Sequence, residues 1–155
     1  MLAFGPDRIF MASGTRLSRG PGGMVPMLAK TAAHLVAEAK AQIETLAPEE
    51  VARELRRGHP LLVDVREPEE RLAHGSIPGA VHAPRGMLEF AADPTSAYHR
   101  AEFDPQRRTI LYCASGGRSA LAAAALRTLG YARVAHLDGG LKAWREAGLT
   151  VDPGS

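Results

Sequence analysis

The chain has 155 residues, a formal net charge of +2, 45% hydrophobic residues and 23% charged residues. This length suits one compact domain with an extension and leaves little room for two. The composition is typical of a globular protein, and no run approaches the ~18 apolar residues that a membrane helix needs. We therefore expect no membrane partner.

The positive charge is concentrated at the N-terminus. Residues 1–26 contain three arginines and one aspartate, so the rest of the chain is neutral overall. This balance argues against a nucleic-acid partner, which would require a basic face.

Residues 1–26 lack apolar periodicity and contain a glycine-rich stretch at 20–23. We interpret them as a disordered tail or as the result of a start codon assigned too early, with Met24 or Met27 as the true start. Their scarcity of acidic residues keeps an organellar transit peptide open as an alternative.

Residues 27–42 predict a helical extension, because the stretch 29–43 is rich in strong helix formers. One face of this helix is apolar. It contains Leu28, Ala32, Leu35, Val36 and Ala39. We expect this face to pack across the domain or to pair with a partner chain, for instance in a homodimer through residues 29–43.

Strand and helix signals alternate over residues 43–152. Apolar runs predict strands at residues 43–46, 61–65, 80–83, 109–112 and 134–137. Helix signals fall at residues 49–57, 68–73, 118–129 and 141–147. The alternation predicts an α/β domain with a central parallel sheet and helices on both faces. In the less regular stretch 84–108 we expect the core to be capped by Met87, Leu88, Phe90, Tyr98 and Phe103.

Cys113 is the only cysteine, which excludes a disulfide or a redox dithiol within the chain. A reducing cytoplasmic compartment is the default expectation. The six histidines lack metal-binding spacing and no phosphate-binding glycine motif occurs, so we expect neither a metal nor another cofactor.

The loop that follows the predicted strand 109–112 carries the chemistry. It consists of Cys113, Ala114, Ser115, Gly116, Gly117, Arg118 and Ser119. A thiol at the carboxyl end of a parallel strand faces the N-terminus of the next helix, which favours the thiolate. The two glycines allow successive N–H groups to turn towards a bound sulfur or oxyanion, and Arg118 adds a positive charge for an anionic donor. A lone cysteine is, however, often a small buried apolar residue, so on spacing alone both interpretations stay open.

Four segments in order resemble the rhodanese family, over about residues 43–151. They are Leu62–Glu67 (LVDVRE), Gly75–Ala80 (GSIPGA), Cys113–Arg118 (CASGGR) and Leu137–Trp144 (LDGGLKAW). The resemblance implies a rhodanese-like fold, in which Cys113 forms a persulfide and the loop amides bind the transferred sulfur. Related phosphatases have five residues between cysteine and arginine, whereas four separate Cys113 from Arg118 here. The shorter loop favours sulfur over phosphate.

Other residues have less certain roles on sequence grounds. Asp64 and Arg66 can support the site, but the favoured interpretation is structural, with each residue pairing with the other's neighbours and holding loops. Arg71 and Arg85 are candidates for an anion-attracting rim, with solvated surface arginines as the equal alternative. Ala114 and Ser115 are neutral where members that prefer thiosulfate carry charges, so thiosulfate itself is expected to be a poor donor.

The leading hypothesis is an enzyme of the thiosulfate sulfurtransferase type. It would move sulfane sulfur from a small anionic, thiosulfate-like donor, through a Cys113 persulfide, to cyanide or a thiol, including a protein thiol. The first alternative is a sulfur-relay or sensing module that binds a protein partner without turnover. A phosphatase-like relative is the second, disfavoured by the loop length.

Overall fold

The computed structural model describes residues 8–10, 16–20, 22–26 and 28–154, and the chain forms two compact units, Met1–His34 and Leu35–Ser155. The first unit contains an antiparallel sheet of β1 (Arg8–Phe10), β2 (Arg16–Gly20) and β3 (Gly23–Pro26), in that order. These strands lie within the stretch for which the sequence signals indicated no regular structure. The proposed origins of residues 1–26 stay predictions.

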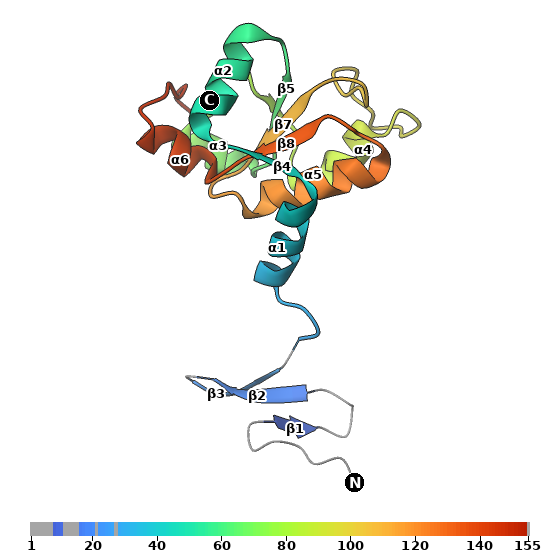
Figure 1. Ribbon diagram of the computed structural model, residues 1–155, viewed down its shortest axis with the longest axis vertical. Helices are drawn as coiled ribbons and strands as arrows, with labels where there is room; N and C mark the ends of the chain where they lie inside the picture. The colour runs from blue at the N-terminus through green and yellow to red at the C-terminus, as the bar shows by residue number, and fades with distance from the viewer. Residues whose placement is uncertain (1–7, 11–15, 21, 27, 155) are drawn as a thin grey trace. The chain divides into compact units, whose positions relative to one another are not determined.

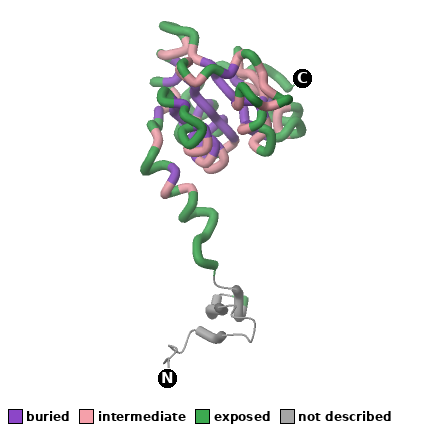
Figure 2. The backbone as a smooth tube through the Cα atoms, turned by 90° about the vertical axis from the view of Figure 1, so that its right-hand side faces the viewer, coloured by how far each residue is buried: buried purple, intermediate pink, exposed green. Residues whose placement is uncertain are grey.

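The second unit is built on a five-stranded, wholly parallel sheet (Figure 1). Its strands are β4 (Glu44–Leu46), β5 (Leu61–Asp64), β6 (Val81–His82), β7 (Thr109–Tyr112) and β8 (Val134–Leu137). The order across the sheet is β4-β8-β7-β5-β6, which places β7 at the centre. All residues of β5, β7 and β8 are buried, as expected for strands covered on both faces (Figure 2).

Helices cover both faces of this sheet. The helices described in the structure are α1 (Ala32–Gln42), α2 (Pro48–Arg57), α3 (Pro68–His74), the short 3₁₀ helix η1 (Arg85–Met87), α4 (Leu88–Ala92), α5 (Gly117–Leu129) and α6 (Gly140–Glu146). One core layer joins α4 and α5 to the sheet, and the other joins α2 and α6 to the opposite face. The predicted α/β architecture is therefore confirmed.

One detail of the predicted packing is wrong. In the stretch 84–108, Leu88 and Phe103 are buried, but Met87, Phe90 and Tyr98 are exposed. Phe90 and Tyr98 instead pack edge to face on each other, with ring centroids 6.4 Å apart. On the apolar face of α1, Ala39 is buried and Leu35 is exposed, and the pairing of this face with a partner chain stays a prediction.

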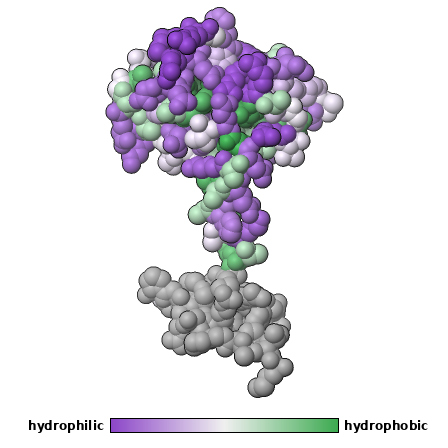
Figure 3. All heavy atoms as spheres, in the orientation of Figure 1, coloured by the Kyte–Doolittle hydropathy of each residue, from purple (hydrophilic) through white to green (hydrophobic). Residues whose placement is uncertain are grey.

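The face of the second unit seen in Figure 3 is mainly hydrophilic, with hydrophobic residues visible in smaller areas between. Within the part of the chain that the structure describes, no helix combines the length and apolar character needed to cross a membrane.

Candidate active site around Cys113

Cys113 lies directly after the central strand β7 and four positions before α5 begins at Gly117. The neighbouring strands β5 and β8 end at the same edge of the sheet, because all three run parallel. This is the edge at which parallel α/β sheets place their ligand sites. Cys113 is only 1% exposed, so its thiol is enclosed by the loop that follows it.

Backbone N–H groups converge on the Cys113 sulfur. The N–H of Gly116 donates to Sγ over 3.1 Å. Burial raises the pKa of Cys113. Hydrogen bonds from the backbone and hydroxyl of Ser119 and from the backbones of Gly116 and Ser115 lower it by more, so the pKa of the thiol lies below its usual value. The loop therefore stabilises a negative charge on Sγ, as a thiolate or persulfide requires.

The loop takes its shape from one glycine and from α6. Gly116 has φ +110°, whereas Gly117 is the first residue of α5 and has no left-handed backbone, so only one of the two glycines is conformationally required. On the other side, the N–H groups of Leu141 and Lys142 donate to the carbonyls of Cys113 (2.9 Å) and Ala114 (3.1 Å). The segment that starts α6 thus holds the loop of Cys113 in place.

Ser119 and His136 extend the site into the core. The Ser119 hydroxyl lies 3.6 Å from Cys113 Sγ, 3.2 Å from the Gly116 carbonyl and 3.0 Å from His136 Nδ1. Both Ser119 and His136 are fully buried. Burial lowers the pKa of His136, so its imidazole is neutral near pH 7.

Arg118, the expected donor-binding cation, is held by a carboxylate. Its two terminal nitrogens contact the Glu70 oxygens at 2.7 and 2.8 Å. Glu70 belongs to α3, which follows β5, so the two residues meet at the edge that carries Cys113. The geometry directs the guanidinium towards α3.

Asp64 and Arg66 form a buried pair beneath the site. Arg66 donates to both Asp64 oxygens, at 3.0 and 2.8 Å, and to the Gly75 carbonyl at 2.6 Å. The Tyr112 hydroxyl donates to Asp64 (2.9 Å) and accepts the N–H of Ile77 (3.0 Å). Because Asp64 and Tyr112 are paired in register on β5 and β7, this cluster braces the strand end that presents Cys113.

The two proposed rim arginines differ in their surroundings. Arg71 lies 3.5 Å from Asp64 Oδ2 and 3.5 Å from the Ser76 hydroxyl, so it belongs to the Asp64 cluster. Arg85 contacts Glu89 at 2.6 Å, one helical turn along the chain. Among the described residues, neither arginine forms a hydrogen bond or ion pair with the loop of Cys113.

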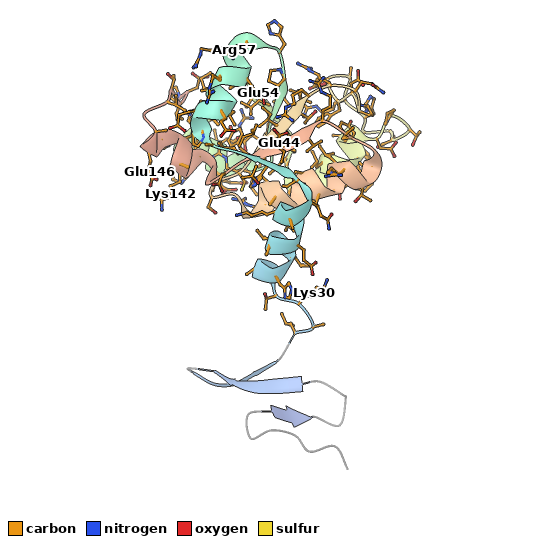
Figure 4. The ribbon with its side chains drawn as sticks, in the orientation of Figure 1. Lys30, Glu44, Glu54, Arg57, Lys142 and Glu146 are labelled. Atoms are coloured by element: carbon orange, nitrogen blue, oxygen red, sulfur yellow. The ribbon has the colours of Figure 1, made fainter. Side chains whose placement is uncertain are left out.

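A cavity of about 740 Å³ opens at the end of the sheet where the strands begin, opposite to the end that carries Cys113. Its lining includes residues at the starts of strands, such as Glu44 and Arg108, whereas Cys113 lies beyond the end of β7. Arg108 joins Glu54 of α2 (2.9 and 2.7 Å) to Glu44 of β4 (2.6 Å); both carboxylates are labelled in Figure 4. This network ties the edge strand to α2 and is remote from the thiol.

Among the described residues, no group of three or more histidine, cysteine or acidic side chains is arranged to hold a metal ion.

The model of the Rhodanese-like domain family matches residues 47–147, which covers well over half of the chain. The chain belongs to this family. A sulfurtransferase of Allochromatium vinosum is 38% identical over 91 residues, covering 59% of this chain and 77% of the relative. Two longer curated relatives, from Synechocystis and Mycobacterium tuberculosis, are covered over only 54% and 24% of their lengths.

Solved structures support the same assignment. A Rhodopseudomonas palustris protein of unknown function, described as a possible tyrosine phosphatase, superimposes with a TM-score of 0.78 and 38% identity, covering 84% of this chain and 100% of its own. The polysulfide-sulfur transferase homodimer of Wolinella succinogenes gives a TM-score of 0.61 and 30% identity, covering 75% and 82%. The rhodanese-like fold expected from the four sequence segments is confirmed.

Sequence reasoning missed three residues that shape this site: Glu70, Tyr112 and His136. His136 was considered only as a metal ligand. Its position two residues after Val134, which faces the α5 layer, indicates that it faces that layer as well. Glu70 and Tyr112 carry no comparable signal, because their partners, Arg118 and Asp64, lie 48 residues away in the chain.

Proposed function

We propose that this protein is a sulfurtransferase that carries sulfane sulfur as a persulfide on Cys113. The observation that carries the proposal is the enclosed Sγ, which accepts the Gly116 N–H at 3.1 Å and lies at the start of α5. The family assignment and the sulfurtransferase among the relatives support the same activity.

In the first half-reaction, the Cys113 thiolate attacks the outer sulfur of an anionic donor. The new Cys–S bond forms as the donor's own S–S bond breaks, and the donor leaves with the bonding electron pair, as sulfite from thiosulfate or as a shortened chain from polysulfide. In the second, a thiolate or cyanide attacks the outer sulfur and the Cys113 thiolate is released. The loop N–H groups stabilise negative charge in both states.

The donor that fits best is a narrow sulfane chain. Cys113 is 1% exposed, and its loop presents neutral Ala114 and Ser115 rather than free cations. Arg118 is engaged by Glu70, which weakens its attraction for the sulfonate oxygens of thiosulfate, a group that polysulfide lacks. The Wolinella relative, named as a polysulfide-sulfur transferase, supports polysulfide as the donor class to test first.

Intact-mass spectrometry after incubation with polysulfide, and separately with thiosulfate, tests the proposal. We expect a gain of one sulfur atom that cyanide or dithiothreitol removes and that Cys113→Ser lacks, with faster loading by polysulfide. Sulfur gain at an unchanged level in Cys113→Ser, or none in the folded wild-type protein with either donor, would contradict it.

A phosphatase is the second candidate, because the Rhodopseudomonas palustris neighbour is described as a possible tyrosine phosphatase. The four-residue spacing between Cys113 and Arg118 and the engagement of Arg118 by Glu70 both disfavour it. Hydrolysis of an aryl phosphate that Cys113→Ser abolishes would establish this alternative.

A relay or sensing module is distinguished by turnover. Such a module would load sulfur on Cys113 yet show negligible steady-state transfer to cyanide or to small thiols. Steady-state thiocyanate formation, measured beside persulfide loading on the same preparation, separates it from the enzyme.

A further inference from the structure

The hydrogen-bond directions around Ser119 are constrained by its single proton. Three neighbours lie within reach of its oxygen: Cys113 Sγ at 3.6 Å, the Gly116 carbonyl at 3.2 Å and His136 Nδ1 at 3.0 Å. A carbonyl can only accept, so the hydroxyl proton goes to Gly116 when Cys113 is a thiol that donates to Oγ. All three contacts of the Ser119 hydroxyl are then hydrogen bonds only if His136 Nδ1 also donates a proton to Oγ.

The other ring nitrogen favours the same tautomer. His136 is neutral and fully buried, and its Nε2 has no hydrogen-bond partner among the described residues. A proton on Nε2 would leave a buried N–H unsatisfied and would turn Nδ1 into a second acceptor for the one Ser119 proton. A buried orphan donor is among the rarest features of folded proteins, so the proton belongs on Nδ1.

We infer that His136 is a positioning residue, whose Nδ1–H fixes Ser119 so that its hydroxyl proton can turn from the Gly116 carbonyl to the Cys113 sulfur when that sulfur becomes an anion. His136 does not touch the sulfur or remove its proton. It occupies one acceptor site on Ser119 Oγ and thereby leaves the hydroxyl proton free for the thiolate.

Charged groups from neighbouring elements also act on this chain of contacts. Lys40 on α1 lowers the pKa of His136, whereas Asp138 after β8 raises it. Arg118 on α5 interacts electrostatically with Cys113. None of these groups is altered in the variants below, so their contributions stay constant across the comparison.

The first experiment reads the tautomer in the wild-type protein and uses a substitution only to assign the signals. Nitrogen-15 NMR of the histidine rings in the wild-type protein distinguishes a protonated from an unprotonated ring nitrogen, and the His136→Asn spectrum identifies the His136 signals by their loss. We expect a neutral ring with the proton on Nδ1. A proton on Nε2 in the folded protein would overturn the inference.

The second experiment compares His136→Asn with His136→Gln and His136→Leu. The asparagine amide N–H can occupy the place of Nδ1–H, whereas glutamine places its amide near Nε2 and leucine offers no donor. The readout is the pH dependence of Cys113 alkylation by iodoacetamide, followed by intact mass. We expect the leucine and glutamine variants to react about three- to tenfold more slowly at pH 7, with the profile moved to higher pH.

His136→Asn should restore most of the alkylation rate of Cys113. The double variant with Ser119→Ala and His136→Leu should be alkylated no more slowly than Ser119→Ala alone, because both substitutions act through the Ser119 hydroxyl. Tyr131→Phe, which removes a buried hydrogen bond to Ala92 in the same core layer, serves as the control and should leave the profile in place. Equal profiles for wild type and a folded His136→Leu, or for asparagine and leucine, would refute the inference. It rests on the proposed role of Cys113, but neither readout requires sulfur transfer, so the two ideas can fail separately.

Discussion

The guanidinium of Arg118 and the carboxylate of Glu70 form a bidentate ion pair, with nitrogen–oxygen distances of 2.7 and 2.8 Å. The pair joins the helix that starts at the catalytic loop to α3. Glu70 also accepts the Glu67 N–H at 2.9 Å, as part of the capping box that starts α3. One carboxylate therefore caps α3 and restrains Arg118, a cation that interacts electrostatically with Cys113.

Glu70→Gln should reduce stability in a pH-dependent way. The hydrogen bond to Arg118 lowers the pKa of Glu70 to about 2 from its ordinary 4.5, so its stabilising contribution is complete above pH 4.5 and is lost as the pH falls through about 2. Because Arg118 is 39% exposed, solvent screens the pair, and we expect a loss of at most ~1 kcal/mol at pH 7. Urea unfolding should show a smaller difference in unfolding free energy between wild type and Glu70→Gln at pH 3 than at pH 7. Glu69→Gln, one position earlier in the same helical turn, controls for the lost charge.

The same substitution should alter donor preference. Releasing Arg118 from a carboxylate gives an anionic donor access to the guanidinium, so thiosulfate should load Glu70→Gln at a lower half-saturating concentration than wild type. Polysulfide loading should change less, because it depends on the narrow loop. A thiosulfate dependence identical to that of wild type would show that Arg118 does not take part in donor capture.

Tyr112→Phe should destabilise the fold more than Tyr131→Phe, although each substitution removes one buried phenolic hydroxyl. The Tyr112 hydroxyl both donates to Asp64 and accepts the Ile77 N–H, whereas that of Tyr131 donates only to the Ala92 carbonyl. Leaving a buried N–H without an acceptor costs about 1–3 kcal/mol. The comparison is made by urea unfolding, and equal losses for the two variants would contradict the bracing role assigned to Tyr112.

Gly140→Ala should disrupt the catalytic loop. A Cβ at Gly140 would lie 2.5 Å from the Cys113 carbonyl oxygen and 2.6 Å from the Ala114 carbonyl carbon, so the loop would have to move. Gly130→Ala is the matched control, because Gly130 also has a positive φ, +108°, but nothing lies within 4 Å of its Cβ position. Both variants carry backbone strain of ~1–3 kcal/mol, yet only Gly140→Ala should lose sulfur loading in the mass assay.

The sequence carried enough signal for the parallel sheet and for the position of Cys113. The continuous apolar runs of β5 and β7 and the proline and glycine that bound α2 are local signals, and the structure has these elements within one or two residues of the predicted limits. Met87, Phe90 and Tyr98 were misplaced because hydrophobicity alone does not say which face of an irregular segment turns inward.

The partners of the site residues were beyond the reach of local patterns. Arg118 looked like a free cation in the sequence, and only the fold brings Glu70 opposite it from 48 residues away. Asp64 and Arg66 are only two residues apart, yet sequence reasoning favoured a role in which each pairs with the other's neighbours, whereas the structure pairs the two side chains with each other. The Glu70–Arg118 contact could not be foreseen because of this separation along the chain, and the Asp64–Arg66 contact because a sequence does not say which of several nearby groups a charged side chain will meet.

Cys113 is enclosed by its loop, and the chain holds no second thiol. If the proposed persulfide forms, no other cysteine of these 155 residues can resolve it into a disulfide. Its lifetime would then depend on how often an external nucleophile reaches Cys113, so the rate of sulfur release from the loaded protein would follow the concentration of acceptor.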